Sequence, residues 1–128
     1  MSSGIKIYKI KDFIRKSESG EIDFEKSIQI IRELSMAAAF HANHNILIDL
    51  RKTTTSVAGM DDLMKIAMEL VQLMPPSFKN KIANVIPNDE DRVFVAENFE
   101  ACMKIKKFQY KFFTDFEQAI EWLSDVRR

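Results

Sequence analysis

The apolar positions of the chain change their spacing within its first third. In "IKIYKI" and "DFIRK" (5–16) they recur at about every second residue, which predicts one or two early strands arranged as a hairpin. The cluster "SESGE" (17–21) is rich in serine, glycine and acids, and it is expected to end these strands. From Asp23, a good N-cap, apolar residues recur every three or four positions to about His41, which predicts a helix with one apolar side.

Three more strands alternate with three more helices. The stretch "NILIDL" is apolar on both faces, as is typical of a central parallel strand covered by helices. A helix is expected from near Met60 to Met74, because Pro75 and Pro76 cannot continue its hydrogen-bond ladder. The remaining strands are predicted in "KIANVIP" (81–87) and "KFQYKFF" (107–113), followed by helices that begin near Asn88 and at Thr114.

This alternation defines the predicted fold class. Strands that are joined through helices need crossover connections, which are almost always right-handed and produce parallel pairs. We therefore predict an α/β fold with a mixed, mostly parallel sheet of four to five strands flanked by four helices, in a single domain that spans residues 1–128. The apolar side of the second helix is predicted to contain Met60, Leu63, Met64, Ala67, Val71 and Met74.

Charge and composition exclude several classes of protein. The 19 basic residues balance the 19 acidic ones, so the chain lacks the net positive field that attracts nucleic acids. No apolar run approaches the roughly 20 residues that a membrane helix needs, so we expect no membrane insertion. The single cysteine, Cys102, cannot form an intrachain disulfide, and the N-terminus lacks the apolar core of a signal peptide. A cytoplasmic protein is expected.

The hydroxyl-rich stretch after "NILIDL" is the candidate site. We expect residues 51–60 to form a loop at the carboxyl ends of the parallel strands, where ligands bind in open sheets. The turns at Asn88 and Thr114 are expected at the same edge. Asp49 and Arg51 are predicted to share a face and to form a salt bridge. The candidate binding residues are Asp49, Arg51, Thr53, Thr54, Thr55, Ser56, Gly59, Met60 and Met64.

These candidates also have purely structural interpretations. Hydroxyls such as those at 53–56 are typical of solvated loops and helix N-caps. Met60, Met64 and Met68 lie four residues apart, and they form either an adaptable apolar wall for a ligand or ordinary core.

Catalytic and cofactor chemistry has weak signals in the sequence. His41 and His44 are two imidazoles without a nearby cysteine or carboxylate cluster, so a metal site built on them is incomplete. Cys102 is interpreted as a small core residue. The sequence has no glycine-rich nucleotide-binding motif, and its two histidines lie at one helix end, which provides no Ser, His and Asp set. We expect no cofactor, no bound metal and no enzymatic activity.

Two segments resemble a known family. The ending "YKFFTDFEQAIEWL" (110–123) resembles the C-terminal signature of the SpoIIAA-like proteins, which are relatives of the STAS domain. The strand "ILIDLR" (46–51) resembles their central strand, and the order of elements fits over about 5–124. The resemblance implies a small domain with a mixed sheet and helices, related to anti-sigma-factor antagonists.

The resemblance also implies a role for the hydroxyl-rich stretch. STAS antagonists carry a phosphorylatable serine between this strand and the next helix, in an Asp-Ser-Ser-Gly context, whereas this chain has "RKTTTSVAGMDDL" there. Ser56 is the candidate for phosphorylation, because Gly59 permits the close approach of backbone amides. A phosphate at Ser56 is expected to face the positive end of the following helix dipole.

Two functions are predicted on this basis, and neither is enzymatic. The first is a regulatory or protein-interaction module that presents residues 51–60 and the following helix to a protein partner. The second is a carrier for a small ligand, a lipid or an anionic amphiphile, held in a cleft lined by Met60, Met64 and Met68. A homodimer is also predicted, because a partner is expected to cover the aromatic residues of the last strand and helix: Phe108, Tyr110, Phe112, Phe113 and Trp122.

Overall fold

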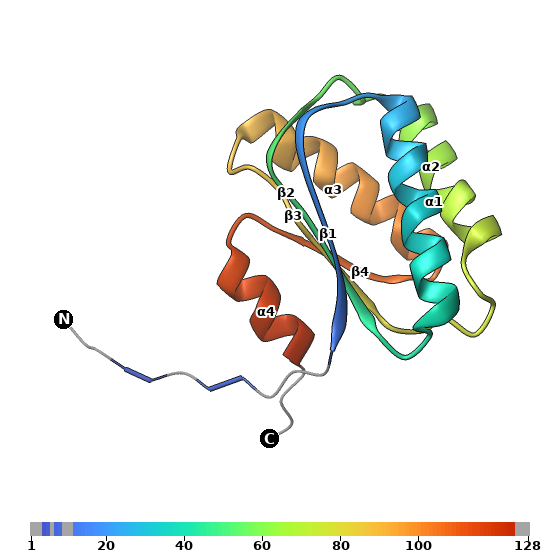
Figure 1. Cartoon of the computed structure of the whole chain (residues 1–128). Helices are drawn as coiled ribbons and strands as arrows, with labels where there is room; N and C mark the ends of the chain where they lie inside the picture. The colour runs from blue at the N-terminus through green and yellow to red at the C-terminus, as the bar shows by residue number, and fades with distance from the viewer. Residues whose placement is uncertain (1–3, 6, 9–11, 125–128) are drawn as a thin grey trace.

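The computed structural model describes residues 4–5, 7–8 and 12–124, in which four strands form one sheet (Figure 1). The strands lie side by side in chain order, and every neighbouring pair is parallel. The strands are β1 (Phe13–Ile22), β2 (Asn45–Thr55), β3 (Lys81–Val85) and β4 (Gln109–Phe113). The helices are α1 (Phe24–Phe40), α2 (Met60–Leu73), α3 (Glu90–Ile105) and α4 (Phe116–Ser124). The predicted α/β class is confirmed, and within the described residues the sheet is wholly parallel rather than mixed.

The helices cover the two faces of the sheet unequally (Figure 1). The larger core cluster joins α1, α2 and α3 to one face, through side chains such as Leu34, Leu63 and Met103. The smaller cluster joins α4 to the other face, where Leu123 packs against Leu47 and its neighbours. Helices on both faces require strands that are apolar on both faces, which is the pattern read in "NILIDL".

The helix ends follow the sequence signals. The Asp23 side chain accepts a hydrogen bond of 2.7 Å from the backbone N of Lys26, so Asp23 is the N-cap of α1. The Asp89 side chain caps α3 in the same way. α2 ends at Leu73, ahead of the proline pair.

The first strand differs from the prediction. β1 continues through "SESGE", which was expected to end it, and it pairs in parallel with β2. Gly20 supports this path with a φ of 84°, in the left-handed region that favours glycine. Of the predicted hairpin's first strand (5–10), residues 5, 7 and 8 have no strand structure, and residues 6, 9 and 10 lie outside the described residues. Pairing with a long partner strand outweighs local propensity here.

β2 is longer than predicted, and it contains a bulge. The strand extends to Thr55, so the first half of the predicted loop at 51–60 is strand and the loop itself is only 56–59. Asp49 and Lys52 pair with Ser17 and Ser19 of β1, so β2 has one extra residue between these two pairs.

The bulge moves side chains from one face of the sheet to the other. Before it, Ile48 belongs to the core beneath α1–α3, and Leu47 belongs to the core beneath α4. After it, Thr53 contacts α3 and Thr55 lines a cavity beneath α1–α3. Both residue numbers are odd, as for Leu47, but the two side chains lie on the opposite face of the sheet from Leu47. An extra residue shifts the alternation by one position, so the bulge divides the predicted site residues between two faces.

The buried side of α2 also differs from the prediction. Leu63, Ile66, Ala67 and Leu70 are buried, whereas the predicted Met60 and Val71 are 49% and 46% exposed. α2 is apolar on two adjoining sides, so helical spacing alone did not identify the side that packs on the sheet.

The aromatic residues assigned to a dimer interface all pack against the two cores of the chain itself. Tyr110 and Phe113 are buried on opposite faces of the sheet. Phe108 and Phe112 pack against the larger core, and Trp122 packs against the smaller one. Two of the five side chains are therefore buried within the chain, whereas Phe108, Phe112 and Trp122 are half-buried, and self-association stays a prediction.

Candidate functional site

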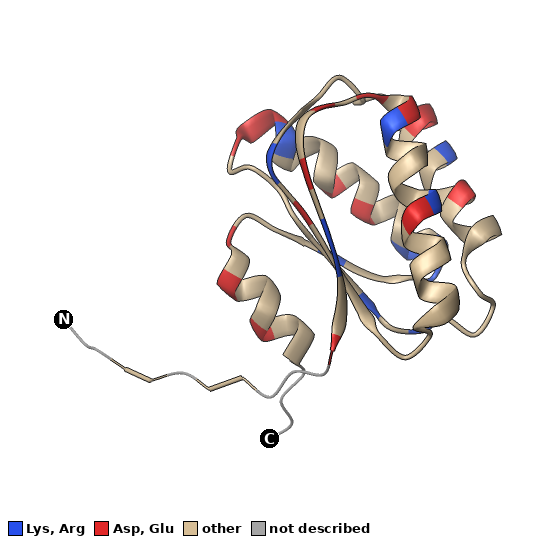
Figure 2. Ribbon diagram, in the orientation of Figure 1, with Lys and Arg blue, Asp and Glu red and all other residues tan. Residues whose placement is uncertain are grey.

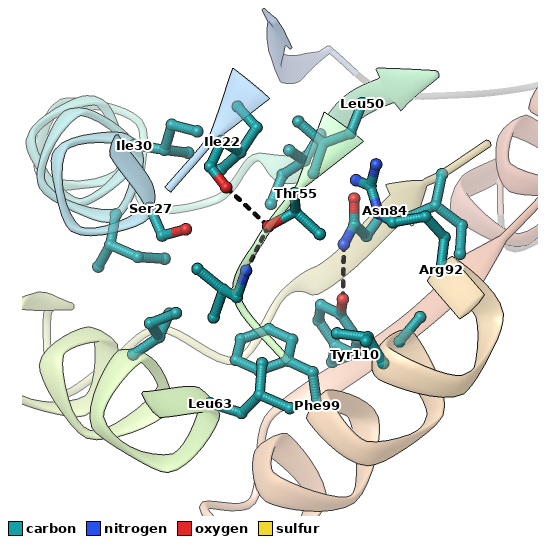
Figure 3. Close-up of a pocket in the computed structure, with 17 residues that line it drawn as sticks. Ile22, Ser27, Ile30, Leu50, Thr55, Leu63, Asn84, Arg92, Phe99 and Tyr110 are labelled. Atoms are coloured by element: carbon teal, nitrogen blue, oxygen red, sulfur yellow. Dashed lines mark hydrogen bonds between the residues drawn. The ribbon is translucent and has the colours of Figure 1, made fainter. Parts of the chain in front are cut away.

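An apolar cavity of about 120 Å³ lies between the sheet and the helices α1, α2 and α3 (Figure 3). Its walls are mostly aliphatic side chains, such as Ile30, Ile48, Leu63 and Val95. It lies toward the edge where the parallel strands end, because Ile22 and Thr55, the last residues of β1 and β2, line it. This is the edge at which the sequence predicted a site.

Two buried polar side chains enter this apolar cavity from β3 and β4. Asn84 and Tyr110 are only 8% and 4% exposed, and Asn84 Nδ2 donates a hydrogen bond of 2.7 Å to Tyr110 Oη (Figure 3). Burial raises the pKa of the Tyr110 hydroxyl far above its usual value, so the phenol stays neutral. Asn84 Oδ1 is buried and has no hydrogen-bond partner among the described residues.

The Asn84 amide keeps one unpaired polar group whichever way it is placed. Asn84 has one acceptor oxygen and an NH2 donor group, and Tyr110 supplies a single hydroxyl. If the amide is turned over, Tyr110 donates to Oδ1 and Nδ2 becomes the unpaired group. In either orientation the pair leaves polar capacity unused inside an apolar cavity.

Arg92 is the charged residue of this cavity. It lies in the first turn of α3, where its backbone N donates to the capping Asp89 side chain. Its guanidinium reaches β2 and donates to Thr53 O at 2.8 Å and to Thr53 Oγ1 at 2.9 Å. Burial lowers the pKa of Arg92, and attraction by Asp89 offsets only part of that effect. Arg92 is thus a half-buried cation held by neutral oxygens.

The hydroxyl-rich residues have separate environments. Thr53 is buried and Thr54 is exposed. Thr55 lines the cavity, where its hydroxyl donates to Ile22 O at 2.6 Å and accepts from Val57 N at 3.1 Å. The predicted hydroxyl N-cap for α2 was wrong, because Gly59 occupies that position and provides no side-chain cap. Ser56 is exposed in the short loop before it.

Asp49 and Arg51 form the predicted salt bridge on the other face of the sheet. The buried Asp49 carboxylate accepts from Arg51 Nε at 2.9 Å, Arg51 Nη2 at 2.8 Å and Arg15 Nη2 at 3.0 Å. Both guanidinium groups lie over the Phe116 ring, 4.5 Å from its centre for Arg51 and 5.1 Å for Arg15. Hydrogen bonds from Arg51 hold the pKa of Asp49 at about 2, below its usual value of 3.8. This cluster attaches the start of α4 to the sheet.

The methionines do not form the predicted cleft. Met60 and Met68 are exposed, and Met64 packs against the larger core, so the wall of the cavity is built from isoleucine, leucine and valine instead. Met60 and Met68 are exposed because α2 packs on the sheet through its adjoining side.

Other candidate chemistry lies elsewhere in the fold. The rings of His41 and His44 are 4.9 Å apart beyond the end of α1. Within 4–5, 7–8 and 12–124 there is no group of three or more His, Cys, Asp or Glu side chains placed to hold a metal. Cys102 is buried, and burial raises the pKa of its thiol. None of the described helices has the length and apolar character needed to cross a membrane.

The predicted site residues did not include Asn84, Arg92 and Tyr110, three of the polar residues that line the cavity. Asn84 carried a usable signal, because an amide in the middle of the apolar strand "KIANVI" is expected to be buried and to need a partner. Arg92 carried none, since its contact with Thr53 spans 39 residues of sequence.

The fold resembles a solved structure. A crystal structure of an uncharacterized protein of the DUF3478 family from Shewanella loihica PV-4, described as having a SpoIIAA-like fold, aligns with a TM-score of 0.54. The alignment covers 96% of this chain and 98% of that chain, at 19% sequence identity. No protein-family model matches the sequence, and the comparison with curated proteins finds no match. The protein therefore has a SpoIIAA-like fold, which confirms the resemblance read from the sequence.

Proposed function

We propose that this protein is a non-enzymatic binding protein for a small, mostly apolar molecule, held in the cavity beneath α1–α3. The observation that carries the proposal is the buried, unpaired amide oxygen of Asn84, a residue that lines a mostly apolar cavity. A buried polar atom without a partner costs about 1–3 kcal/mol. A ligand with a polar group next to an apolar body supplies the missing hydrogen bond and fills the remaining space.

The size of the cavity limits the ligand. An apolar cavity of roughly 150 Å³ in another protein stays dry and binds benzene. The cavity here is about 120 Å³, so it suits an apolar group of about six carbon atoms. A long lipid chain exceeds this volume unless part of it lies outside the cavity.

Filling the cavity is expected to block binding. Ala96 lines the cavity on α3 and is 6% exposed, so Ala96→Met places additional atoms in the empty space. The affinity for 1-hexanol, measured by isothermal titration calorimetry, is expected to fall by about tenfold or more. Ala101→Met is the matched control, because Ala101 lies on the same helix with its side chain exposed.

The outcome separates a ligand site from a water-filled or empty space. Equal affinities for the wild type, Ala96→Met and Ala101→Met would place hexanol binding outside the cavity. Absence of binding to the wild type at millimolar hexanol would contradict the proposal directly.

A second candidate function, a regulatory or protein-interaction module, is supported by the outer surface of α2. Met60, Met68 and Val71 are 49%, 45% and 46% exposed, and their spacing places them on one side of the helix. Neighbouring exposed apolar side chains often mark an interaction surface. The exposed Ser56 lies just before this helix, where a phosphate would add charge beside the same surface.

A single charged substitution on α2 tests this candidate. Met68→Glu is expected to remove any protein partner that co-purifies with the wild-type chain from its own host, and Ser56→Asp is expected to change its amount. Gln72→Glu is the control, because it adds the same charge at an exposed position of α2. An unchanged set of partners across all three variants, measured by quantitative mass spectrometry, would contradict the interaction surface.

A further inference from the structure

We propose that the ligand of this cavity is a small monocarboxylate whose anionic group binds Arg92 and whose apolar part, of about six carbon atoms, fills the space beneath α1–α3. The inference rests on the proposed function and specifies its ligand class. Arg92 is assigned as the residue that makes the cavity selective for an anionic ligand.

The first support is the environment of Arg92. The hydrogen bonds of its guanidinium go to two neutral oxygens of Thr53, and no carboxylate within the described residues forms an ion pair with it. A half-buried cation without a paired anion carries a desolvation cost, which a bound anion offsets. Its other N–H groups have no acceptor in the described part of the chain, so they are available to a carboxylate.

Nearby acidic residues do not provide the missing anion. Asp89, Glu90 and Asp91 lie at the start of α3, where the ribbon in Figure 2 is red for acidic residues. All three are exposed, and water and salt weaken their field at Arg92. The pKa of Arg92 is lowered overall, so desolvation of this guanidinium outweighs the attraction by Asp89.

The second support is the Asn84 and Tyr110 pair, which lines the same cavity as Arg92 (Figure 3). With the Asn84 amide turned over, Tyr110 donates to Asn84 Oδ1 and Asn84 Nδ2 is free to donate to a carboxylate oxygen. A carboxylate accepts hydrogen bonds only, so with the Asn84 amide in this turned-over orientation it can accept from both Arg92 and Asn84 N–H groups. One ligand then satisfies both the buried amide and the unpaired cation.

Three ligands of one chain length test the charge preference. Hexanoate, 1-hexanol and hexylammonium are titrated at pH 7 into the wild type by isothermal titration calorimetry. Hexanoate is expected to bind about tenfold or more tightly than 1-hexanol, because a charge-assisted hydrogen bond is stronger than one between neutral groups. Hexylammonium is expected to bind weakest, because its charge is the same as that of Arg92.

Variants of Arg92 then test whether this residue causes the preference for hexanoate. Arg92→Met is expected to abolish the preference for hexanoate over 1-hexanol, and Arg92→Lys is expected to retain that preference. Arg92→Gln keeps a donor for Thr53 and replaces Arg92→Met if that variant fails to fold. Arg32→Met is the control, because Arg32 lies on α1 with its side chain 64% exposed and does not line the cavity.

The results separate the ligand class from the proposed function. If 1-hexanol and hexanoate bind equally and Arg92→Met changes neither, the carboxylate inference is overturned while the cavity remains a binding site. Tighter binding of hexylammonium overturns it as well. If the wild type binds none of the three, or if Ala96→Met leaves every affinity unchanged, the proposed function itself fails.

Discussion

Replacement of Asp49 by alanine is expected to lower the free energy of unfolding by about 2 kcal/mol at pH 7. The carboxylate is 7% exposed and accepts hydrogen bonds from Arg15 and Arg51, which also lie over the Phe116 ring. Its loss leaves two neighbouring guanidinium groups without their shared anion and loosens the start of α4. Chemical denaturation of Asp49→Ala measures the effect, with the exposed Glu97→Ala on α3 as a control that should change little.

The same contribution should disappear in acid. The pKa of Asp49 is depressed in the folded state, to about 2 from 3.8. A carboxyl with a depressed pKa stabilises the fold above its unfolded pKa, and this stabilisation is lost as the pH falls from about 4 toward the folded pKa. The difference between the wild type and Asp49→Ala should therefore shrink over that interval. A difference that stays constant from neutral pH to about pH 2.5 would show that the carboxylate charge is not its source.

Replacement of Leu47 by alanine is expected to cost about 3 kcal/mol of unfolding free energy. Leu47 is fully buried in the smaller core cluster, where α4 covers the second face of the sheet. That cluster contains few side chains, so little can move into the space that the leucine leaves. Leu73→Ala, at a position that is 40% exposed at the end of α2, is the matched control and is expected to cost far less. Similar losses for both variants would contradict the packing of α4 on β2.

These two residues lie on the α4 side of the sheet, whereas the cavity lies on the side of α1–α3. Asp49 and Arg51 were grouped with Thr53 and Thr55 in one predicted site, because all four lie close together in sequence where the strand was expected to end in a loop. The structure separates them, so the salt bridge belongs to the attachment of α4 and the threonines belong to the surroundings of the cavity.

Most elements of the fold could be predicted from local sequence. Asp23 and Asp89 mark the starts of α1 and α3, because a cap acts on amides only a few residues away. The proline pair after Met74 stops α2 for a similarly local reason. The Asp49 and Arg51 ion pair was also predictable, because it joins residues two apart on one strand. The alternation of strands and helices predicted a parallel sheet. The site was then expected at the carboxyl ends of its strands.

Only the tertiary structure decided which side chains lie at the carboxyl ends of the strands. The bulge at 50–51 depends on how β1 pairs with β2, and the choice between two apolar sides of α2 depends on what packs against it. Arg92 reaches Thr53 across 39 residues, and Asn84 meets Tyr110 across 26. Caps and turns act over a few residues and leave their signature in the local sequence. A cavity is the space left between elements that pack from distant parts of the chain, so its lining and its unpaired atoms are set by packing rather than by any local pattern.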